Sequence, residues 1–178
     1  MNQPLDQPND IRIRPVAESD VVPYRELRLE ALRLHPDAFS SDYAQQQQYP
    51  PTFWNERIHK AIGNPELIIF VAETDQGLVG MTGIGRGDSP KTAHTAWVWG
   101  VYVRAEYRRR RLGRMLLEAC QDWARSSGVR IIKLGVAVNN TGALRCYTRC
   151  GYEVYGTEPQ AISWQGQDYD EHLMALKL

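Results

Sequence analysis

Residues 101–117 read VYVRAEYRRRRLGRMLL and place an apolar strand, a basic turn and the start of a helix in direct succession. Val101, Tyr102 and Val103 are typical of a strand, and apolar residues recur at helical spacing from Leu112 to Trp123. The N-terminus of a helix carries unpaired backbone N–H groups and about half a positive charge. A turn that leads into such a helix is therefore a natural binding site for a phosphate group.

The turn is also rich in arginine. Six arginines lie in or beside it, at positions 104, 108, 109, 110, 111 and 114, and Glu106 is the acidic residue among them. Because a guanidinium group donates paired hydrogen bonds to phosphate oxygens, the run predicts a polyphosphate ligand. The alternatives are a solvated surface turn and a nucleic-acid patch. The run is compact and no second basic cluster accompanies it, so we expect no nucleic acid.

The composition indicates one folded domain without a global charge. The chain has 178 residues, and its 21 basic and 21 acidic residues cancel, so no overall field attracts nucleic acid or an anionic membrane. No apolar run approaches the roughly 18 residues of a membrane helix, and residues 1–10 lack the features of a signal peptide. We expect a cytoplasmic protein with no membrane contact, consisting of a polar tail at 1–10 and a single domain at 11–178. Cys120, Cys146 and Cys150 contain no CxxC pair, so neither disulfides nor a metal site is expected.

Hydrophobic periodicity predicts a mixture of strands and helices. Strands are expected at 11–16, 67–73, 78–86, 96–103 and 131–138, and a hairpin at 152–164 and 169–176. Helices are expected at about 20–34, from residue 51 to about 62, at 112–127 and at 140–150. Residues 39–51 carry prolines and a run of four glutamines, which favours a loop or an irregular helix, and this segment is a candidate lid.

Two segments resemble motifs of the GCN5-related N-acetyltransferase (GNAT) superfamily. The basic turn is similar to the pyrophosphate-binding signature R/Q-x-x-G-x-G/A, with Arg108 at its first position, Gly113 at its last and Arg111 where the middle glycine stands. Residues 134–152 resemble the later motif N-x-x-A-x-x-x-Y-x-x-x-G-F/Y, and the residues in register are Asn140, Ala143, Tyr147, Gly151 and Tyr152. The tail looks like a bacterial branch of the superfamily that acts on small molecules or proteins.

The resemblance implies a fold and a cofactor. The fold is an α+β acyltransferase fold, in which a mixed, mostly antiparallel sheet of about seven strands has helices on both faces. The cofactor is acetyl-CoA, bound where strand 96–103 splays from strand 131–138, with Gly100 marking a bulge. The implied cofactor-binding residues are Val101, Tyr102, Val103, Arg108, Arg109, Arg110, Arg111, Leu112, Gly113, Arg114, Asn140, Ala143 and Tyr147. Asn140 has an alternative role as a simple helix cap.

The resemblance also implies direct attack of a primary amine on the thioester within a ternary complex. Tyr147 is the implied general acid, because a phenol with a pKa of about 10 can protonate a thiolate whose thiol has a pKa of about 8.5. As an alternative, Tyr147 is a core aromatic residue on one helix face. Many relatives carry a glutamate early in the central strand, and Trp97 stands there in this chain. We therefore expect an acceptor amine of low pKa, or a base that acts through water, for which the candidates are Glu73, Glu158 and Glu171.

The acceptor site is expected at an aromatic pocket. The predicted substrate-binding residues are Phe39, Tyr49, Trp97, Trp99 and Glu158, although strand aromatics also commonly belong to the core. The expected acceptor is a small-molecule amine or a protein N-terminus, and the chain is expected to be a monomer or a homodimer. A different function, a CoA-binding sensor with weak catalysis, follows if Arg111 and Trp97 have disabled the reaction.

Overall fold

The computed structural model describes residues 11–178, and the predicted tail at 1–10 lies outside the described residues. Seven strands form one sheet in the order β1-β2-β3-β4-β5-β7-β6. The strands are β1 (Arg12–Pro15), β2 (Leu67–Thr74), β3 (Gly77–Arg86), β4 (Thr95–Val103), β5 (Ile131–Ala137), β6 (Glu153–Trp164) and β7 (Gln167–Lys177). The α-helices are α1 (Val21–Leu34), α2 (Tyr43–Gln46), α3 (Pro51–His59), α4 (Leu112–Ser126) and α5 (Thr141–Arg149). Only β4 and β5 are parallel neighbours, which confirms the predicted mixed, mostly antiparallel α+β fold.

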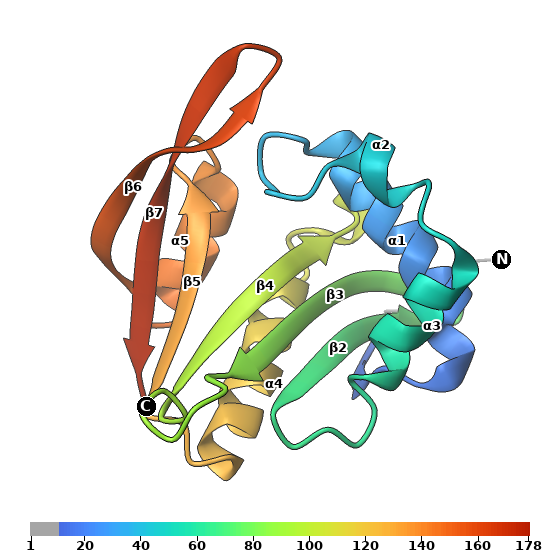
Figure 1. The fold of residues 1–178 in the computed structure, drawn as a ribbon, viewed down its shortest axis with the longest axis horizontal. Coiled ribbons are helices and arrows are strands. Elements are labelled where there is room, and N and C mark those ends of the chain that lie inside the picture. Colours follow the sequence, from blue (N-terminus) through green and yellow to red (C-terminus); the bar gives the residue numbers. More distant parts are fainter. Residues whose placement is uncertain (1–10) are drawn as a thin grey trace, which may run out of the picture.

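Helices cover both faces of the sheet (Figure 1). One face is covered by α4, whose apolar stripe includes the fully buried Leu116 and Leu117. The opposite face is covered by α1 and α3, which bury Leu27 and Trp54. Because side chains alternate along a strand, β4 contributes Val98 to the core under α4 and its neighbour Trp99 lies on the α1 side. The sheet therefore separates an α4 side from an α1 side.

The central strands β4 and β5 diverge, as predicted. They pair only from Thr95 to Trp97, opposite Ile131 to Lys133, and Figure 1 shows them close together near the bottom of the view and apart at the top. The register between β3 and β4 also shifts, because one extra residue of β4 is inserted between Trp99 and Tyr102. Gly100 lies at this bulge with a φ of 66°, a backbone conformation that L side chains rarely adopt.

The segment between α1 and β2 is mostly irregular, as expected. The backbone N–H of His35 makes the last hydrogen bond of α1, to Ala31, and Pro36 follows, which disfavours further helix. The short helix α2 is capped by Asp42, whose side chain accepts a hydrogen bond of 2.7 Å from the N–H of Gln45. Across residues 11–178, no helix is both long and apolar enough to cross a bilayer, and no group of His, Cys, Asp and Glu gathers to hold a metal ion. The three cysteines are free.

Candidate active site

A cavity of about 820 Å³ opens where the turn before α4, the start of α5 and the segment after α1 meet. This volume lies within the range of about 300–1,000 Å³ that is usual for ligand sites. The structure brings together twelve of the thirteen predicted cofactor-binding residues on its wall: Val101, Tyr102, Val103, Arg108, Arg109, Arg111, Leu112, Gly113, Arg114, Asn140, Ala143 and Tyr147. Arg110 does not line it.

The turn before α4 presents a row of free backbone donors. Arg109 and Arg111 have φ values of 63° and 64°, in the left-handed region, and Arg111 is the N-cap residue of α4 without a side-chain cap. Within the described residues, no backbone N–H from 109 to 114 donates a hydrogen bond to another protein group. Successive free N–H groups at a helix start form a concave anion site. The arginine at position 111 thus keeps the backbone conformation for which the family signature carries glycine.

Arg108 is held in place from two sides. Its Nε donates a hydrogen bond of 3.0 Å to the carbonyl of Val103, and its Nη2 donates one of 2.8 Å to Nε2 of His35. Burial, followed by the charge of Arg108, lowers the pKa of His35, so the imidazole is neutral at pH 7 and can accept this bond. The residue that follows α1 is therefore hydrogen-bonded to the turn before α4.

Tyr147 projects from α5 into the same cavity. Its ring belongs to the core and meets the ring of Tyr152 edge-on at 6.2 Å. Its hydroxyl makes no hydrogen bond to any described residue, and burial is the main cause that raises its pKa. The phenol therefore stays protonated well above neutral pH, which is the state a proton donor needs. Asn140 caps α5 by accepting a hydrogen bond of 3.2 Å from the N–H of Ala143, and it also lines the cavity.

A second cavity, of about 80 Å³, lies between the splayed strands. Its walls come from β4 at residues 98–101 and from β5 at residues 134–137. Phe39, Val101, Asn140 and Tyr147 line both this splay cavity and the larger one, so the two spaces adjoin. The splay cavity thus adjoins the space beside the turn before α4 and reaches the α1 side of the sheet at Trp99.

The structure separates the predicted substrate-binding residues into two groups. Phe39 and Trp99 line the splay cavity. The other three, Tyr49, Trp97 and Glu158, line neither cavity. The ring centre of Tyr49 lies 4.3 Å from that of Phe53, and Trp97 is 41% exposed where β4 is still paired with β5. Glu158 lies opposite Glu171 in the β6–β7 hairpin.

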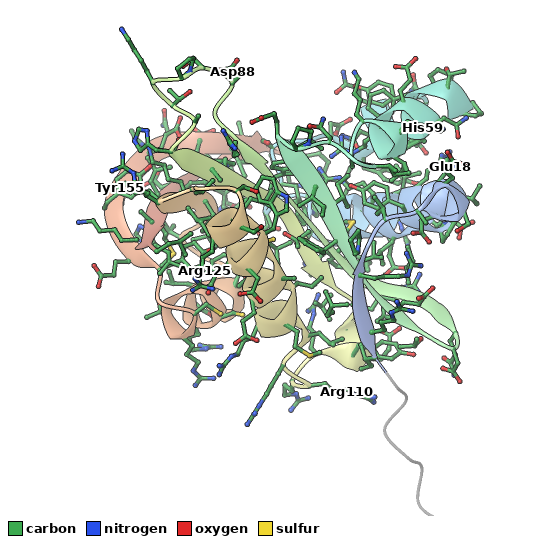
Figure 2. All side chains as sticks on the ribbon, turned by 90° about the horizontal axis from the view of Figure 1, so that it is seen from below. Glu18, His59, Asp88, Arg110, Arg125 and Tyr155 are labelled. Carbon is green, nitrogen blue, oxygen red and sulfur yellow. The ribbon has the colours of Figure 1, made fainter. Side chains whose placement is uncertain are left out.

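Arg110, the remaining predicted cofactor residue, turns away from the cavity. Its guanidinium lies 5.3 Å from the centre of the Tyr107 ring, and Figure 2 shows it at the edge of the molecule.

The three candidate bases differ in their surroundings. Glu73 accepts hydrogen bonds of 2.7 Å from Arg14, which lower its pKa. Glu171 instead lies against Gly135, where an added Cβ would be 2.8 Å from its Oε2, and Gly135 lines the splay cavity. Burial, followed by the charge of Glu158, raises the pKa of Glu171. Gly135 alternates with Leu134 and Val136, which join the core under α4, so Glu171 lies on the α1 side of the sheet.

Several cavity residues have no signal in the sequence motifs. His35 and Asp37 follow α1, and Asn139 precedes α5. The side chain of Asn139 donates a hydrogen bond of 3.0 Å to Asp37, which joins segments 102 residues apart in the chain. Contacts of this kind depend on the folded topology, so spacing in the sequence does not reveal them. Arg145, Cys146 and Arg149 line the cavity because they share one face of α5.

Comparison with known proteins identifies the family. Residues 27–152 match the model of the acetyltransferase (GNAT) family. The chain belongs to this family. As a GNAT enzyme it is an N-acetyltransferase that uses acetyl-CoA as the acetyl donor, which confirms the predicted activity and cofactor.

Two curated relatives act on amino acids or their analogues. The L-amino acid N-acetyltransferase AaaT of Escherichia coli is 29% identical over 126 residues, which cover 68% of this chain and 74% of that protein. The L-methionine sulfoximine/L-methionine sulfone acetyltransferase of Pseudomonas aeruginosa is 32% identical over 78 residues, 44% of this chain and 45% of that protein.

Solved structures share the fold. An acetyltransferase of the GNAT family from Streptococcus pneumoniae gives a TM-score of 0.83 at 21% identity, covering 95% of this chain and 100% of that one. The structure of yncA from Salmonella typhimurium, solved with its cofactor acetyl-CoA, gives 0.82 at 23% identity, covering 95% of this chain and 94% of that one.

Proposed function

We propose that this enzyme acetylates the α-amino group of a free amino acid or a close analogue. The observation that carries the proposal is the splay cavity, which opens from the phosphate-binding turn toward the α1 side and is lined there by Phe39 and Trp99. Its size suits a reacting group and a small acceptor rather than a protein segment. The curated relatives that act on L-amino acids and methionine sulfoximine support the same acceptor class.

The donor site fits the phosphates and the arm of acetyl-CoA. The free N–H groups from 109 to 114 would bind the diphosphate, with Arg108 and Arg111 adding charge. The divergence of β4 from β5 leaves backbone groups near Val101 and Val103 without a partner on β5, so they would bind the pantetheine amides, apart from the Val103 carbonyl, which already accepts a hydrogen bond from Arg108. Acetyl-CoA supplies the acetyl group as an activated thioester.

The residues around the splay cavity then have distinct roles in the proposal. Glu171 accepts a proton from the acceptor's ammonium group, through water, because its half-buried carboxylate has a raised pKa and is a stronger base than an exposed one. The hydroxyl of Tyr147 donates a proton to the departing sulfur, because burial keeps this phenol protonated. Phe39 and Trp99 exclude water from the cavity between them.

The test is a measurement of free CoA thiol released from acetyl-CoA across a panel of acceptors. The panel holds L-amino acids, methionine sulfoximine, polyamines and a peptide with a free N-terminus. We expect turnover to be highest with one or more L-amino acids. Turnover only with polyamines or with the peptide would contradict the proposed acceptor class, and CoA binding without turnover of any amine would support the sensor function instead.

A further inference from the structure

Arg28 is a charged residue in a position that the helix pattern assigns to the core. It lies on the buried face of α1 with Tyr24, Leu27 and Ala31, and it is only 5% exposed. Arginine is almost never buried to this extent unless a partner neutralises it. Arg28 therefore requires an explanation that the fold alone does not supply.

No protein group compensates the charge of Arg28. Its Nε and Nη1 atoms are sealed from solvent without a hydrogen-bond partner, and Arg28 forms no ion pair within residues 11–178. Glu30, two residues further along α1, is engaged by Arg104 at 3.0 Å and by the hydroxyl of Tyr102 at 2.8 Å. Burial lowers the pKa of Arg28 to about 10, so it is still a cation at neutral pH.

The guanidinium lies beside the splay cavity. Its Cζ is 5.0 Å from the centre of the Phe39 ring, and its Nη1 is 3.6 Å from the position that a Cβ on Gly100 would occupy. Phe39 and Gly100 both line the splay cavity. The ring of Phe39 attracts the cation but accepts none of its directed N–H bonds. Arg28 does not itself line the cavity, so an unpartnered, buried guanidinium lies directly behind this part of its wall, on the α1 side where Trp99 and Glu171 also lie.

We propose that Arg28 binds the carboxylate of the acceptor, so that the enzyme selects amines that carry a carboxylate near the amino group. This inference rests on the proposed function and assigns the residue that determines its acceptor class. A carboxylate matches the guanidinium in geometry and charge, because it can accept paired hydrogen bonds from the edge formed by Nη1 and Nη2 or from the edge formed by Nε and Nη2, so each edge includes one of the two unpartnered atoms. The amino group of an α-amino acid is then held a short distance from the carboxylate, toward the splay.

The strongest consequence concerns amines that lack the carboxylate. Such an amine fills the apolar part of the site but leaves the guanidinium of Arg28 buried and unpaired. An unsatisfied buried donor costs binding free energy, so the enzyme should discriminate strongly against these amines. L-Methionine and 3-(methylthio)propylamine differ only by this group. We expect the wild-type kcat/KM to favour L-methionine by at least about 100-fold. L-Phenylalanine and phenethylamine form a second pair for the same comparison.

The test combines these pairs with substitutions at Arg28. In Arg28→Met the ratio between each amino acid and its decarboxylated amine is expected to collapse toward about one, mainly through a higher KM for the amino acid. Arg28→Lys keeps the charge but loses the fork, so it should retain an intermediate ratio. The control is Arg125→Met, which removes an exposed arginine on α4 (Figure 2) and should preserve the ratio.

Stability measurements separate a binding role from a structural one. If the role of Arg28 is to bind a ligand, the cation is unpaired in the free enzyme. Replacing it by methionine should then leave the melting temperature of the free enzyme equal to that of the wild type or higher. Binding of N-acetyl-L-methionine or L-methionine to the enzyme–CoA complex, measured by calorimetry, should be lost in Arg28→Met while CoA affinity is kept. A melting temperature that falls, with both members of a pair losing activity equally, would overturn the inference.

The outcomes also distinguish this inference from the proposed function. If the enzyme acetylates amines equally well with and without a carboxylate, the acetyltransferase function stands but the proposed role of Arg28 is refuted. If no amine is turned over, the proposed function fails, and calorimetry with L-methionine then decides on Arg28 alone: binding that needs Arg28 supports the carboxylate site, and no binding refutes it.

Discussion

Replacing Arg111 by glycine should stabilise the free enzyme. Arg111 holds a φ of 64° at the N-cap of α4, and an L side chain in this conformation costs about 1–2 kcal/mol. Glycine removes that strain, but it also raises the conformational entropy of the unfolded chain, which offsets about 0.5–1 kcal/mol of the gain. The net gain is at most about 1.5 kcal/mol, with a midpoint of about 0.75 kcal/mol, which corresponds to a melting temperature about 2–3 °C higher and at most about 6 °C higher for a chain of this size.

The measurement is a thermal melt without cofactor, so that lost phosphate contacts do not enter. Arg110→Gly is the matched control, because Arg110 is the neighbour with a negative φ. Glycine at this position adds only unfolded-state freedom and removes the packing on Tyr107, so we expect the melting temperature to fall. Equal losses in Arg110→Gly and Arg111→Gly would refute the argument that position 111 is strained.

Three further predictions concern the cofactor site and the proton transfers. Gly113→Glu should weaken CoA binding at least tenfold, about 1.4 kcal/mol, because it puts negative charge among the free N–H groups; unchanged affinity in calorimetry would move the phosphate site elsewhere. Tyr147→Phe should lower kcat by about 100-fold or more with CoA affinity kept, since only the proton donor is lost, and a wild-type kcat would leave Tyr147 as a core residue. Because the pKa of Glu171 is raised, its carboxylate is lost as pH falls through a value above the usual range, and kcat should decline with it. Glu158→Gln removes the like charge, and the decline in kcat should therefore shift to lower pH. If the decline at acid pH persists in Glu171→Gln, Glu171 is excluded as the base.

The sequence predicts most of the elements because their signals are local. The apolar stripe from Leu112 to Trp123 and the alternation in the strands specify each segment without knowledge of the others. The phosphate site is predicted for the same reason, since a basic turn and the helix that follows it are adjacent in the chain. Gly100 is readable as a bulge because glycine adopts its left-handed backbone conformation without the steric cost that a Cβ adds.

The directions in which individual side chains point, and hence the residues of the proposed acceptor site, could not be predicted in this way. Arg28 occupies a core position of α1, and the sequence does not reveal that no carboxylate faces it. Arg109 and Arg111 have positive φ values and line the cavity while Arg110 does not, so counting arginines overstates the number that the cavity wall contains. Aromatic residues on strands point to either face, and only the register of β4 shows that Trp99 reaches the splay and Trp97 does not.

Because β4 and β5 pair over a short length, the sheet has two parts, or leaves, with few backbone hydrogen bonds between them. Among the described strands, the ladder between the leaf β1–β4 and the leaf β5–β7 has three residue pairs, from Thr95 to Trp97, and side-chain packing under α4 joins the leaves elsewhere. Each leaf is bonded internally along much longer ladders. Partial unfolding can therefore spread through one leaf while the other stays protected from solvent deuterium. A donor bound between β4 and β5, as proposed, would contact both leaves and add contacts where the ladder is short.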